Sequence, residues 1–302
     1  MNERAFVRNL GIFNSEEQAR IENVTIAVGG VGGDGGEIAE LLTRMGVGNG
    51  SGELRLADPD VFEIENTNRQ NACTSETIGE NKALAVGAQL REINPDINLK
   101  IYTDGVTKEN VDEFVEGADL VIDESEFTLH QIAVMIARSA RVKNIPVLTG
   151  MNVGFAGVVT TYHPKGKTIE SQLGLSTDMP IDEVADHKVS AKRWAPYIPS
   201  YVDLKVLREV TEGKRVMPSI SPGMSVAASA TATQALWNIF EQKNHRPKPV
   251  YFKRALVIDV GAQFAKTISF DLKSYYRHGM NVWIKNLLGN PHADYWQYEV
   301  SQ

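Results

Sequence analysis

A run of glycines between a predicted strand and a predicted helix is the feature of this sequence that most restricts its fold. The segment Gly30-Val-Gly-Gly-Asp-Gly-Gly36 follows the apolar stretch 24–28 and precedes a helix pattern with apolar residues from Ile38 to Met45. In such a unit the first glycine permits a tight turn, the second lets the backbone approach a phosphate, and the third lets the helix pack close to the strand. The pattern predicts a nucleotide or dinucleotide site. A glycine-rich turn without a ligand is the alternative.

Four glycines of this loop are expected to contact the nucleotide: Gly30, Gly32, Gly33 and Gly35. The helix that follows offers unpaired N–H groups and the positive end of its dipole to an anion. Asp34 lies inside the loop, where a carboxylate would repel a phosphate. We therefore expect the Asp34 side chain to cap the helix.

The rest of the chain continues the alternation of strand and helix patterns. Short apolar runs separated by amphipathic helices predict a parallel sheet with helices on both faces. The expected strands are 24–28, 54–57, 99–102, 119–123, 146–149, 153–162, 256–260 and 267–270, and the expected helices lie near 38–45, 83–93, 129–142 and 225–240. The fold class is α/β: a Rossmann-like, mostly parallel sheet, extended by additional strands in the second half.

No linker or shift in composition divides the chain, so we expect a single domain over residues 1–302. Residues 1–150 are expected to form a nucleotide-binding half, and residues 151–302 a half for substrate and dimer contacts. The segment of about 164–220 has weak periodicity and is expected to cross over the surface as a long excursion.

The composition disfavours several classes of protein. There are 31 Lys and Arg against 38 Asp and Glu, and the net charge of −7 is unfavourable for general binding to nucleic acid or anionic membranes. Cys73 is the only cysteine, which excludes an intrachain disulfide, and we interpret it as a small, partly buried residue. The first residues lack the apolar core of a signal peptide, and no apolar run is long enough to span a membrane. We expect a soluble, cytoplasmic protein.

Charged residues beyond the glycine loop distinguish two kinds of nucleotide enzyme. Asp58 stands at the end of the second predicted strand, where an acidic side chain can bind the hydroxyl groups of a ribose. A carboxylate in this position is expected both in a nicotinamide dehydrogenase and in an ATP enzyme, so it does not distinguish them. Arg69 and Lys82 favour ATP, because Arg makes forked contacts with phosphate and Lys supplies a point charge. Two solvated surface cations are the alternative interpretation. Asp123 and Glu126 follow the fourth strand, where a carboxylate can hold Mg²⁺ against phosphates.

Six sequence blocks together carry a resemblance to a known family. They are GGVGGDGG at 29–36, DPDVFEIENTNRQ at 58–70, the lysine of GENKA at 82, DLVIDESE at 119–126, GMNVGFAGVVTTYHP at 150–164 and SPGMSVAASATATQALW at 221–237. With them the chain resembles the ThiF/MoeB adenylating enzymes, the bacterial relatives of the ubiquitin-activating enzymes. The resemblance runs from about Arg4 to Phe240.

The resemblance implies an ATP- and Mg²⁺-dependent adenylyltransferase that activates a carboxylate as an acyl-adenylate, releases pyrophosphate and forms a homodimer. The residues implied in nucleotide binding are Gly30, Gly32, Gly33, Gly35, Asp58, Asp60, Asn66, Arg69, Gln70 and Lys82. Those implied in catalysis are Arg69, Lys82 and Arg8, of which the last resembles an arginine that reaches the ATP of the partner subunit. Glu126 stands where the family usually has an aspartate for Mg²⁺, with Asp123 nearby, and Phe127 stands where an asparagine is usual.

The substrate and acceptor remain open in the sequence. The carboxylate could belong to a small carrier protein, a peptide or a metabolite, and no cysteine after Cys73 can accept the acyl group in the family's usual place. The alternatives are a tRNA threonylcarbamoyladenosine dehydratase-like enzyme, which would make tRNA a partner, an NAD(P)-dependent oxidoreductase, and a non-catalytic half of a heterodimer. The aromatic stretch from Tyr275 to Trp296 is expected to pack on the dimer or to cover the substrate cleft.

Overall fold

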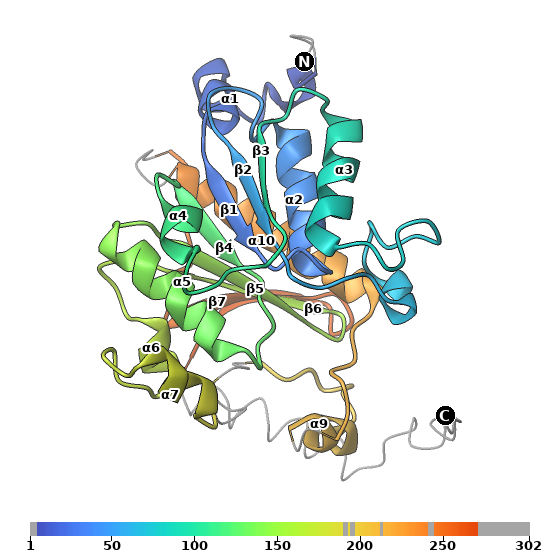
Figure 1. Cartoon of the computed structure of the whole chain (residues 1–302), viewed down its shortest axis with the longest axis vertical. Coiled ribbons are helices and arrows are strands. Elements are labelled where there is room, and N and C mark those ends of the chain that lie inside the picture. The colour runs from blue at the N-terminus through green and yellow to red at the C-terminus, as the bar shows by residue number, and fades with distance from the viewer. Residues whose placement is uncertain (1–4, 190–192, 194–196, 212–213, 241–244, 271–302) are drawn as a thin grey trace.

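An eight-stranded sheet forms the centre of the molecule in a computed structural model (Figure 1). The structure describes the chain except for residues 1–4, 190–192, 194–196, 212–213, 241–244 and 271–302. The strands are β1 (Ile26–Gly29), β2 (Leu54–Ala57), β3 (Leu99–Tyr102), β4 (Leu120–Asp123), β5 (Val147–Val153), β6 (Ala156–Tyr162), β7 (Arg254–Asp259) and β8 (Phe264–Ser269). Their order is β3-β2-β1-β4-β5-β6-β7-β8.

The first five strands are parallel and the last three are antiparallel, so the predicted α/β sheet with added strands in the second half is confirmed. The chain runs from β1 outward to β3 and then returns to the other side of β1 with β4. This reversal creates a switch point, and ligands bind outside the carboxyl ends of the strands at such a point. Gly29, the last residue of β1, pairs with Ala57 of β2 and with Asp123 of β4, so the segments after these strands meet at one edge.

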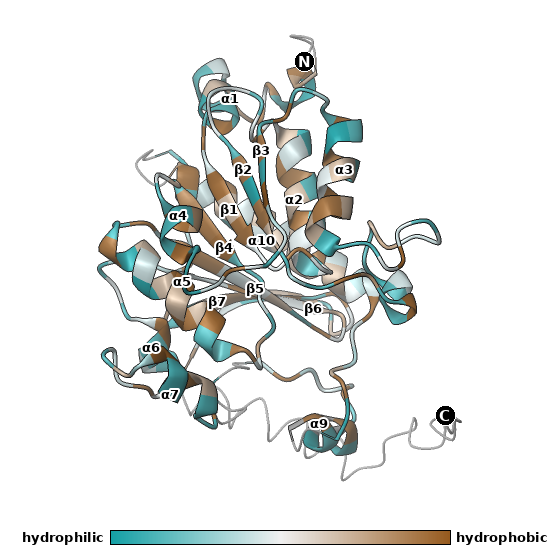
Figure 2. Cartoon of the chain, in the orientation of Figure 1, coloured by the Kyte–Doolittle hydropathy of each residue, from teal (hydrophilic) through white to brown (hydrophobic). Residues whose placement is uncertain are grey.

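Helices cover both faces of the sheet, as predicted. The helical segments are η1 (Val7–Asn9), α1 (Ser15–Glu22), α2 (Asp34–Met45), η2 (Ile64–Asn68), α3 (Lys82–Ile93), α4 (Val111–Val115), α5 (His130–Val142), α6 (Ile169–Leu173), α7 (Ile181–Asp186), α9 (Leu204–Thr211) and α10 (Ser221–Ile239). One apolar core lies between the sheet and α2, α3 and α10, and a second lies between the sheet and α4 to α7. The apolar character of β1 and β4 fits their position between these two layers (Figure 2).

The segment of about 164–220, which was expected to cross over the surface, is partly packed into the core within its described residues. It contains α6 and α7, and Ile169, Leu173 and Val184 are buried in the core beside α5. Glu170 is also completely buried, and it accepts hydrogen bonds from Arg138 and Arg141 of α5 at 2.9–3.2 Å. Helices of five or six residues are too short to show a periodic pattern in the sequence. A charged residue such as Glu170 is expected at the surface when only the sequence is known, so its burial was not predicted.

Among the described residues, no helix is long and apolar enough to cross a membrane. The aromatic stretch from Tyr275 to Trp296 lies outside the described residues, so its expected contacts with a dimer or with the cleft stay a prediction.

Candidate functional site

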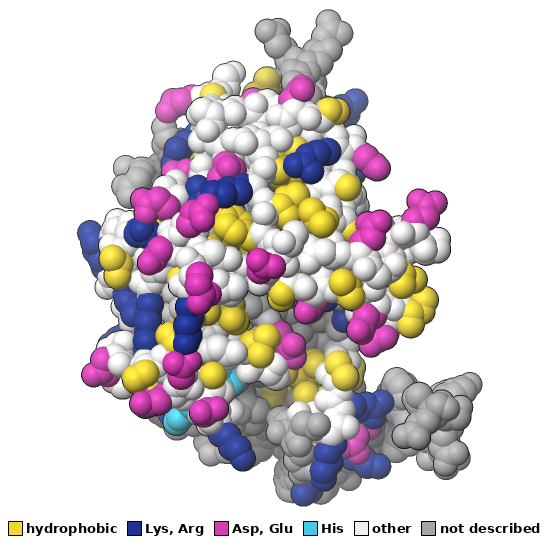
Figure 3. Space-filling view, in the orientation of Figure 1, with side chains coloured by type: hydrophobic (Ala, Val, Ile, Leu, Met, Phe, Trp, Pro, Cys, Tyr) yellow, Lys and Arg dark blue, Asp and Glu magenta, His cyan; other side chains and the backbone are white. Residues whose placement is uncertain are grey.

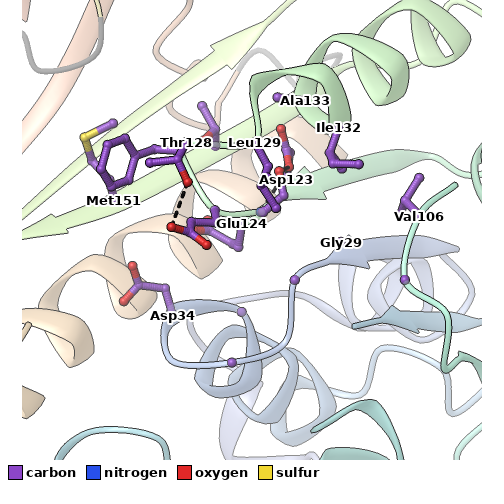
Figure 4. A pocket seen from close by; sticks show the side chains of 18 of the residues that line it. Gly29, Asp34, Val106, Asp123, Glu124, Thr128, Leu129, Ile132, Ala133 and Met151 are labelled. Atoms are coloured by element: carbon purple, nitrogen blue, oxygen red, sulfur yellow. Dashed lines mark hydrogen bonds between the residues drawn. The ribbon is translucent and has the colours of Figure 1, made fainter. Parts of the chain in front are cut away.

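A cleft of about 1220 Å³ opens at the carboxyl edge of β1 and β4, where the topology of the sheet predicts a ligand. Its walls include the glycine loop, the turn after β2, the segment after β4 and the strand β5. Figure 4 shows this arrangement, with Asp34 at the start of α2 and with Asp123 and Glu124 at the end of β4. A typical small-molecule pocket has a volume of about 300–1,000 Å³. The cleft therefore has room for more than one small ligand.

The glycine loop needs two of its glycines for the fold. Gly30 has a φ of +83°, and a Cβ there would lie 2.4 Å from the carbonyl oxygen of Glu124. A Cβ on Gly35 would lie 1.9 Å from the carbonyl oxygen of Gly30. Gly32 differs, because the three atoms nearest to a Cβ there belong to the Gln70 side chain, at 3.4–3.6 Å. The fold therefore explains Gly30 and Gly35, whereas close approach of a ligand is the better reason for Gly32.

Asp34 does not cap α2, contrary to the prediction from the sequence. Gly33 is the N-cap residue and makes no side-chain capping bond, and Asp34 is already the first residue of the helix. Its two carboxylate oxygens accept from Nδ2 of Asn152 at 3.1 and 2.8 Å. Burial raises the pKa of Asp34 to about 6, and the bonds from Asn152 oppose this rise. The side chain is thus directed toward β5 rather than toward the first N–H groups of its own helix.

Asp58 is buried beside the glycine loop, at the position expected for a ribose ligand. Its Oδ2 accepts from the backbone N–H of Val31 at 2.9 Å, and its Oδ1 accepts from that of Asp60 at 3.0 Å. Burial raises the pKa of this carboxyl group. Each carboxylate oxygen has a second lone pair, so Asp58 can fix the loop and still accept from a hydroxyl group.

Two cations reach the same cleft from different elements. Lys82 begins α3, and its Nζ lies 2.9 Å from Oδ2 of Asp60. Arg69 follows η2, and its Nη1 donates to the carbonyl oxygen of Glu65 at 3.2 Å and to Oδ1 of Asn68 at 2.8 Å. Both cations line the cleft, as predicted from the sequence.

Gln70 lies against the glycine loop, where its side-chain atoms are the nearest to a Cβ built on Gly32. It is 6% exposed and lines the cleft, and its Oε1 is a buried atom without a hydrogen-bond partner. Buried polar atoms without a partner are rare in native proteins. An oxygen acceptor in this position fits a site that a ligand with a donor group completes.

The structure does not bring Asn66 and Arg8 into this cleft. Asn66 is buried in η2, where its Oδ1 accepts from the backbone N–H of Glu63 at 3.1 Å. Arg8 is exposed in η1 and does not line the cleft. A role for Asn66 in holding phosphate and a role for Arg8 in a partner's site therefore stay predictions.

Three carboxyl groups follow β4. Oδ1 of Asp123 accepts from the N–H and the hydroxyl group of Ser125, and Glu126 is exposed and accepts from Thr128. Glu124 was not predicted as a site residue from the sequence, and its Oε1 accepts a hydrogen bond from the N–H of Gly150 at 2.9 Å. Burial raises the pKa of Asp123 to about 6 and that of Glu124 well above its usual range.

No group of three or more His, Cys, Asp and Glu among the described residues could hold a metal ion. At nucleotide sites Mg²⁺ needs only one or two carboxylates, because phosphates and water supply the other oxygens. A site of that kind at Asp123 and Glu126 stays a prediction. Cys73 is buried with a raised thiol pKa, which fits the interpretation as a small buried residue.

The architecture is shared with solved structures of low sequence identity. The structure of Escherichia coli MccB with ATP has a TM-score of 0.63 and 18% identity, and the match covers 89% of this chain and 71% of that one. The crystal structure of PaaA has a TM-score of 0.59 and 20% identity, with 84% of this chain and 66% of that one covered. At these identities the comparison supports the fold alone.

The matches to three curated relatives cover slightly more than half of the length of each relative. The SAMP-activating enzyme E1 of Haloferax volcanii is 33% identical over 50% of this chain and 54% of its own. The tRNA threonylcarbamoyladenosine dehydratase of Bacillus subtilis is 35% identical over 48% of this chain and 56% of its own length. The sulfur carrier protein adenylyltransferase of Thermus thermophilus is 29% identical over 53% of this chain and 56% of its own length. The chain thus spans about half the length of these relatives. The ThiF family profile matches residues 6–264, most of the chain, and we conclude that this protein belongs to the ThiF family.

Proposed function

We propose that this protein is an ATP-dependent adenylyltransferase that activates a carboxylate as an acyl-adenylate and releases pyrophosphate. The observation that carries the proposal is the meeting of four features around one cleft at the switch point of the sheet. They are the uncapped start of α2, the buried Asp58, and the two cations Arg69 and Lys82. Membership in the ThiF family and a relative named as a sulfur carrier protein adenylyltransferase support the same activity.

In this proposal the phosphates of ATP lie against Gly32 and Gly33, where the N–H groups at the start of α2 are free of a side-chain cap. Asp58 binds the ribose, and Arg69 and Lys82 neutralise the triphosphate from two sides. The substrate carboxylate attacks the α-phosphorus, a new O–P bond forms, and the bond to pyrophosphate breaks. No general base is needed, because a carboxylate is ionised at neutral pH. The protein acts mainly by positioning and charge neutralisation.

Asp123 and Glu126 are the proposed Mg²⁺ ligands, with the remaining oxygens supplied by phosphate and water. Bound there, the ion would neutralise phosphate charge as the pyrophosphate leaves. The protein would form a homodimer, in which Arg8 of one subunit approaches the nucleotide of the other.

The substrate is proposed to be the C-terminus of a small carrier protein or a peptide, with a small-molecule acid as the other option. A relative is named for a sulfur carrier protein, and MccB has been crystallised with N-formylated MccA. The cleft of about 1220 Å³ extends from the glycine loop to Ile181 and Met217, well beyond the expected nucleotide. This outer part can take the end of a polypeptide.

A dehydratase acting on tRNA is the second candidate, because a Bacillus subtilis relative carries that name. Acidic and basic side chains are interspersed over the face that Figure 3 shows, and the net charge is −7. Both observations are less favourable for tRNA than for a protein or peptide. A nicotinamide oxidoreductase leaves Arg69 and Lys82 without a role.

A thermal-shift comparison of ATP with Mg²⁺, AMP, NAD⁺ and NADPH tests the proposal. A ligand at 100 times its Kd adds about 2.7 kcal/mol to the stability, which raises the melting temperature by several degrees. We expect a shift with ATP and Mg²⁺ that Arg69→Ala reduces. Arg44→Ala is the matched control, because Arg44 pairs with Glu40 near the far end of α2.

Carboxylate substrates can then be sought by ATP–pyrophosphate exchange. A shift with a nicotinamide cofactor alone would support the oxidoreductase, and no shift with any ligand would support the non-catalytic half of a heterodimer. Exchange that requires tRNA would support the dehydratase.

A further inference from the structure

Five polar residues are linked by hydrogen bonds of their side chains and of one backbone carbonyl group along the glycine-loop side of the cleft. Asp34 accepts from Asn152, and Oδ1 of Asn152 accepts from the hydroxyl group of Ser219 at 2.8 Å. The carbonyl oxygen of Ser219 accepts from Nδ2 of Asn68 at 3.0 Å, and Oδ1 of Asn68 accepts from Arg69 at 2.8 Å. We call these five residues the Arg69 network.

The Arg69 network joins parts of the chain that are far apart in the sequence. Its links connect residues that are 118, 67 and 151 positions apart, from the start of α2 to β5, to the segment before α10 and to the end of η2. All its members except Asn68 line the cleft.

The network holds one edge of the Arg69 guanidinium and leaves the other edge available. Nη1 is bound to Asn68 and to the carbonyl oxygen of Glu65, while the structure describes no protein partner for Nε and Nη2. An arginine fixed in this way loses less conformational freedom when its remaining donors bind a phosphate.

We propose that Asn68 and Asn152 are positioning residues that hold Arg69 in the orientation in which it binds the triphosphate of ATP. Asn68 acts directly on the guanidinium. Asn152 acts through Ser219, whose backbone carbonyl fixes Asn68, and Asp34 fixes the amide of Asn152. The inference rests on the proposed function, since it requires that ATP binds in this cleft.

A purely structural role of these asparagines makes a different prediction. If the two asparagines only hold segments of the chain together, replacing them changes the whole site, and the variants bind ATP and AMP more weakly to the same extent. If the asparagines act through Arg69, their replacement weakens the binding of ATP but not of AMP. This weakening disappears in a protein that already carries Arg69→Ala. A double-mutant cycle separates these two cases.

The experiment is a calorimetric titration of the full-length protein with ATP and Mg²⁺, and with AMP. Arg69→Ala is expected to weaken ATP binding on the order of tenfold or more, as for a charge-assisted hydrogen bond. Asn68→Ala is expected to weaken it by about three- to tenfold and Asn152→Ala by about two- to threefold. In the Arg69→Ala background neither replacement should add a loss, and AMP binding should stay unchanged throughout.

Two further comparisons sharpen the test. Asp34→Asn and Asp34→Leu both remove the negative charge of Asp34, but only asparagine keeps an oxygen acceptor for Asn152, so Asp34→Leu should bind ATP less tightly than Asp34→Asn. Asn238→Ala is the matched control, because Asn238 also bridges two groups but does not line the cleft.

Three results would overturn this inference alone. The asparagine replacements could weaken ATP binding equally with and without Arg69, they could weaken the binding of ATP and AMP equally, or they could leave ATP binding unchanged. A wild-type protein that does not bind ATP would overturn the proposed function and this inference together.

Discussion

Alanine replacements at Gly32 and Gly35 distinguish a glycine that is needed for ligand binding from one that is needed for folding. A Cβ at Gly32 would meet atoms of the flexible Gln70 side chain at 3.4–3.6 Å, which is ordinary van der Waals contact. A Cβ at Gly35 would lie 1.9 Å from the carbonyl oxygen of Gly30, which is backbone and cannot move away alone. The folded protein without ligand therefore accepts alanine at Gly32 and does not accept it at Gly35.

The expected magnitudes follow from these contacts. Gly32→Ala should change the free energy of unfolding by less than about 1 kcal/mol, because the loss of unfolded-state entropy stabilises by about 0.4–1 kcal/mol and the new contacts are ordinary. Gly35→Ala should destabilise by at least about 1–3 kcal/mol, as overpacking does. With ATP bound, a methyl group on Gly32 keeps a phosphate from the backbone. The loss of one charge-assisted hydrogen bond of about 1.5–3 kcal/mol weakens binding by roughly ten- to a hundredfold.

Urea unfolding followed by circular dichroism gives the stabilities, and calorimetric titration with ATP and Mg²⁺ gives the affinities. Gly32→Ala that binds ATP as tightly as the wild type would refute the assignment of this loop to phosphate. Gly32→Ala that unfolds as easily as Gly35→Ala would show that both glycines only serve the turn.

Three further replacements test the charged residues. Lys82→Ala should weaken ATP binding on the order of tenfold, yet reduce the free energy of unfolding by no more than about 1 kcal/mol, because its partner Asp60 is 65% exposed. Lys100→Ala, which breaks an exposed pair with Glu113, is its control in the same calorimetric titration, and equal affinity losses in both variants would contradict the assignment. Asp34→Asn should raise the melting temperature relative to the wild type at pH 7 and not at pH 4. The wild type loses stability as the pH rises from about 4 to 6, because the folded state keeps a proton on Asp34 that the unfolded state releases. A difference in melting temperature that does not change with pH would argue against this titration. Glu170→Gln should reduce the free energy of unfolding at pH 7 by about 2–4 kcal/mol, because it breaks a buried charge cluster with Arg138 and Arg141. Its pKa is lowered in the folded state, so this stabilisation is present above pH 4.5 and is lost as the pH falls through the lowered pKa, where urea curves of variant and wild type should converge.

Local patterns were sufficient for the central sheet. The strands 54–57 and 99–102 were predicted with the bounds that the structure shows, because in each a charged residue alternates with apolar residues between polar turns. The glycine loop and Asp58 were also placed correctly relative to the sheet. A strand–glycine–helix unit is local in sequence, and the carboxyl ends of parallel strands share one edge.

The same reasoning could not find residues whose role depends on distant partners. Asn152 lies on β5 and looks like any strand residue, since its contacts with Asp34 and Ser219 join segments 118 and 67 positions away. Glu124 stands beside Asp123 in the sequence, yet only the fold shows that it turns to Gly150. Glu170 was missed for the same reason, because its arginines come from another helix.

The wrong prediction for Asp34 strengthens the case for an anion site. A capping carboxylate would have bound the first N–H groups of α2 and occupied the place where a phosphate is expected. The structure instead turns Asp34 to Asn152, and Gly33, which has no side chain, is left as the N-cap residue. The donors at the start of this twelve-residue helix thus have no side-chain cap, beside a cleft lined by Arg69 and Lys82. A helix start without a side-chain cap leaves its first N–H groups and the positive end of its dipole available to an anion, which favours the proposed phosphate site over a capped turn.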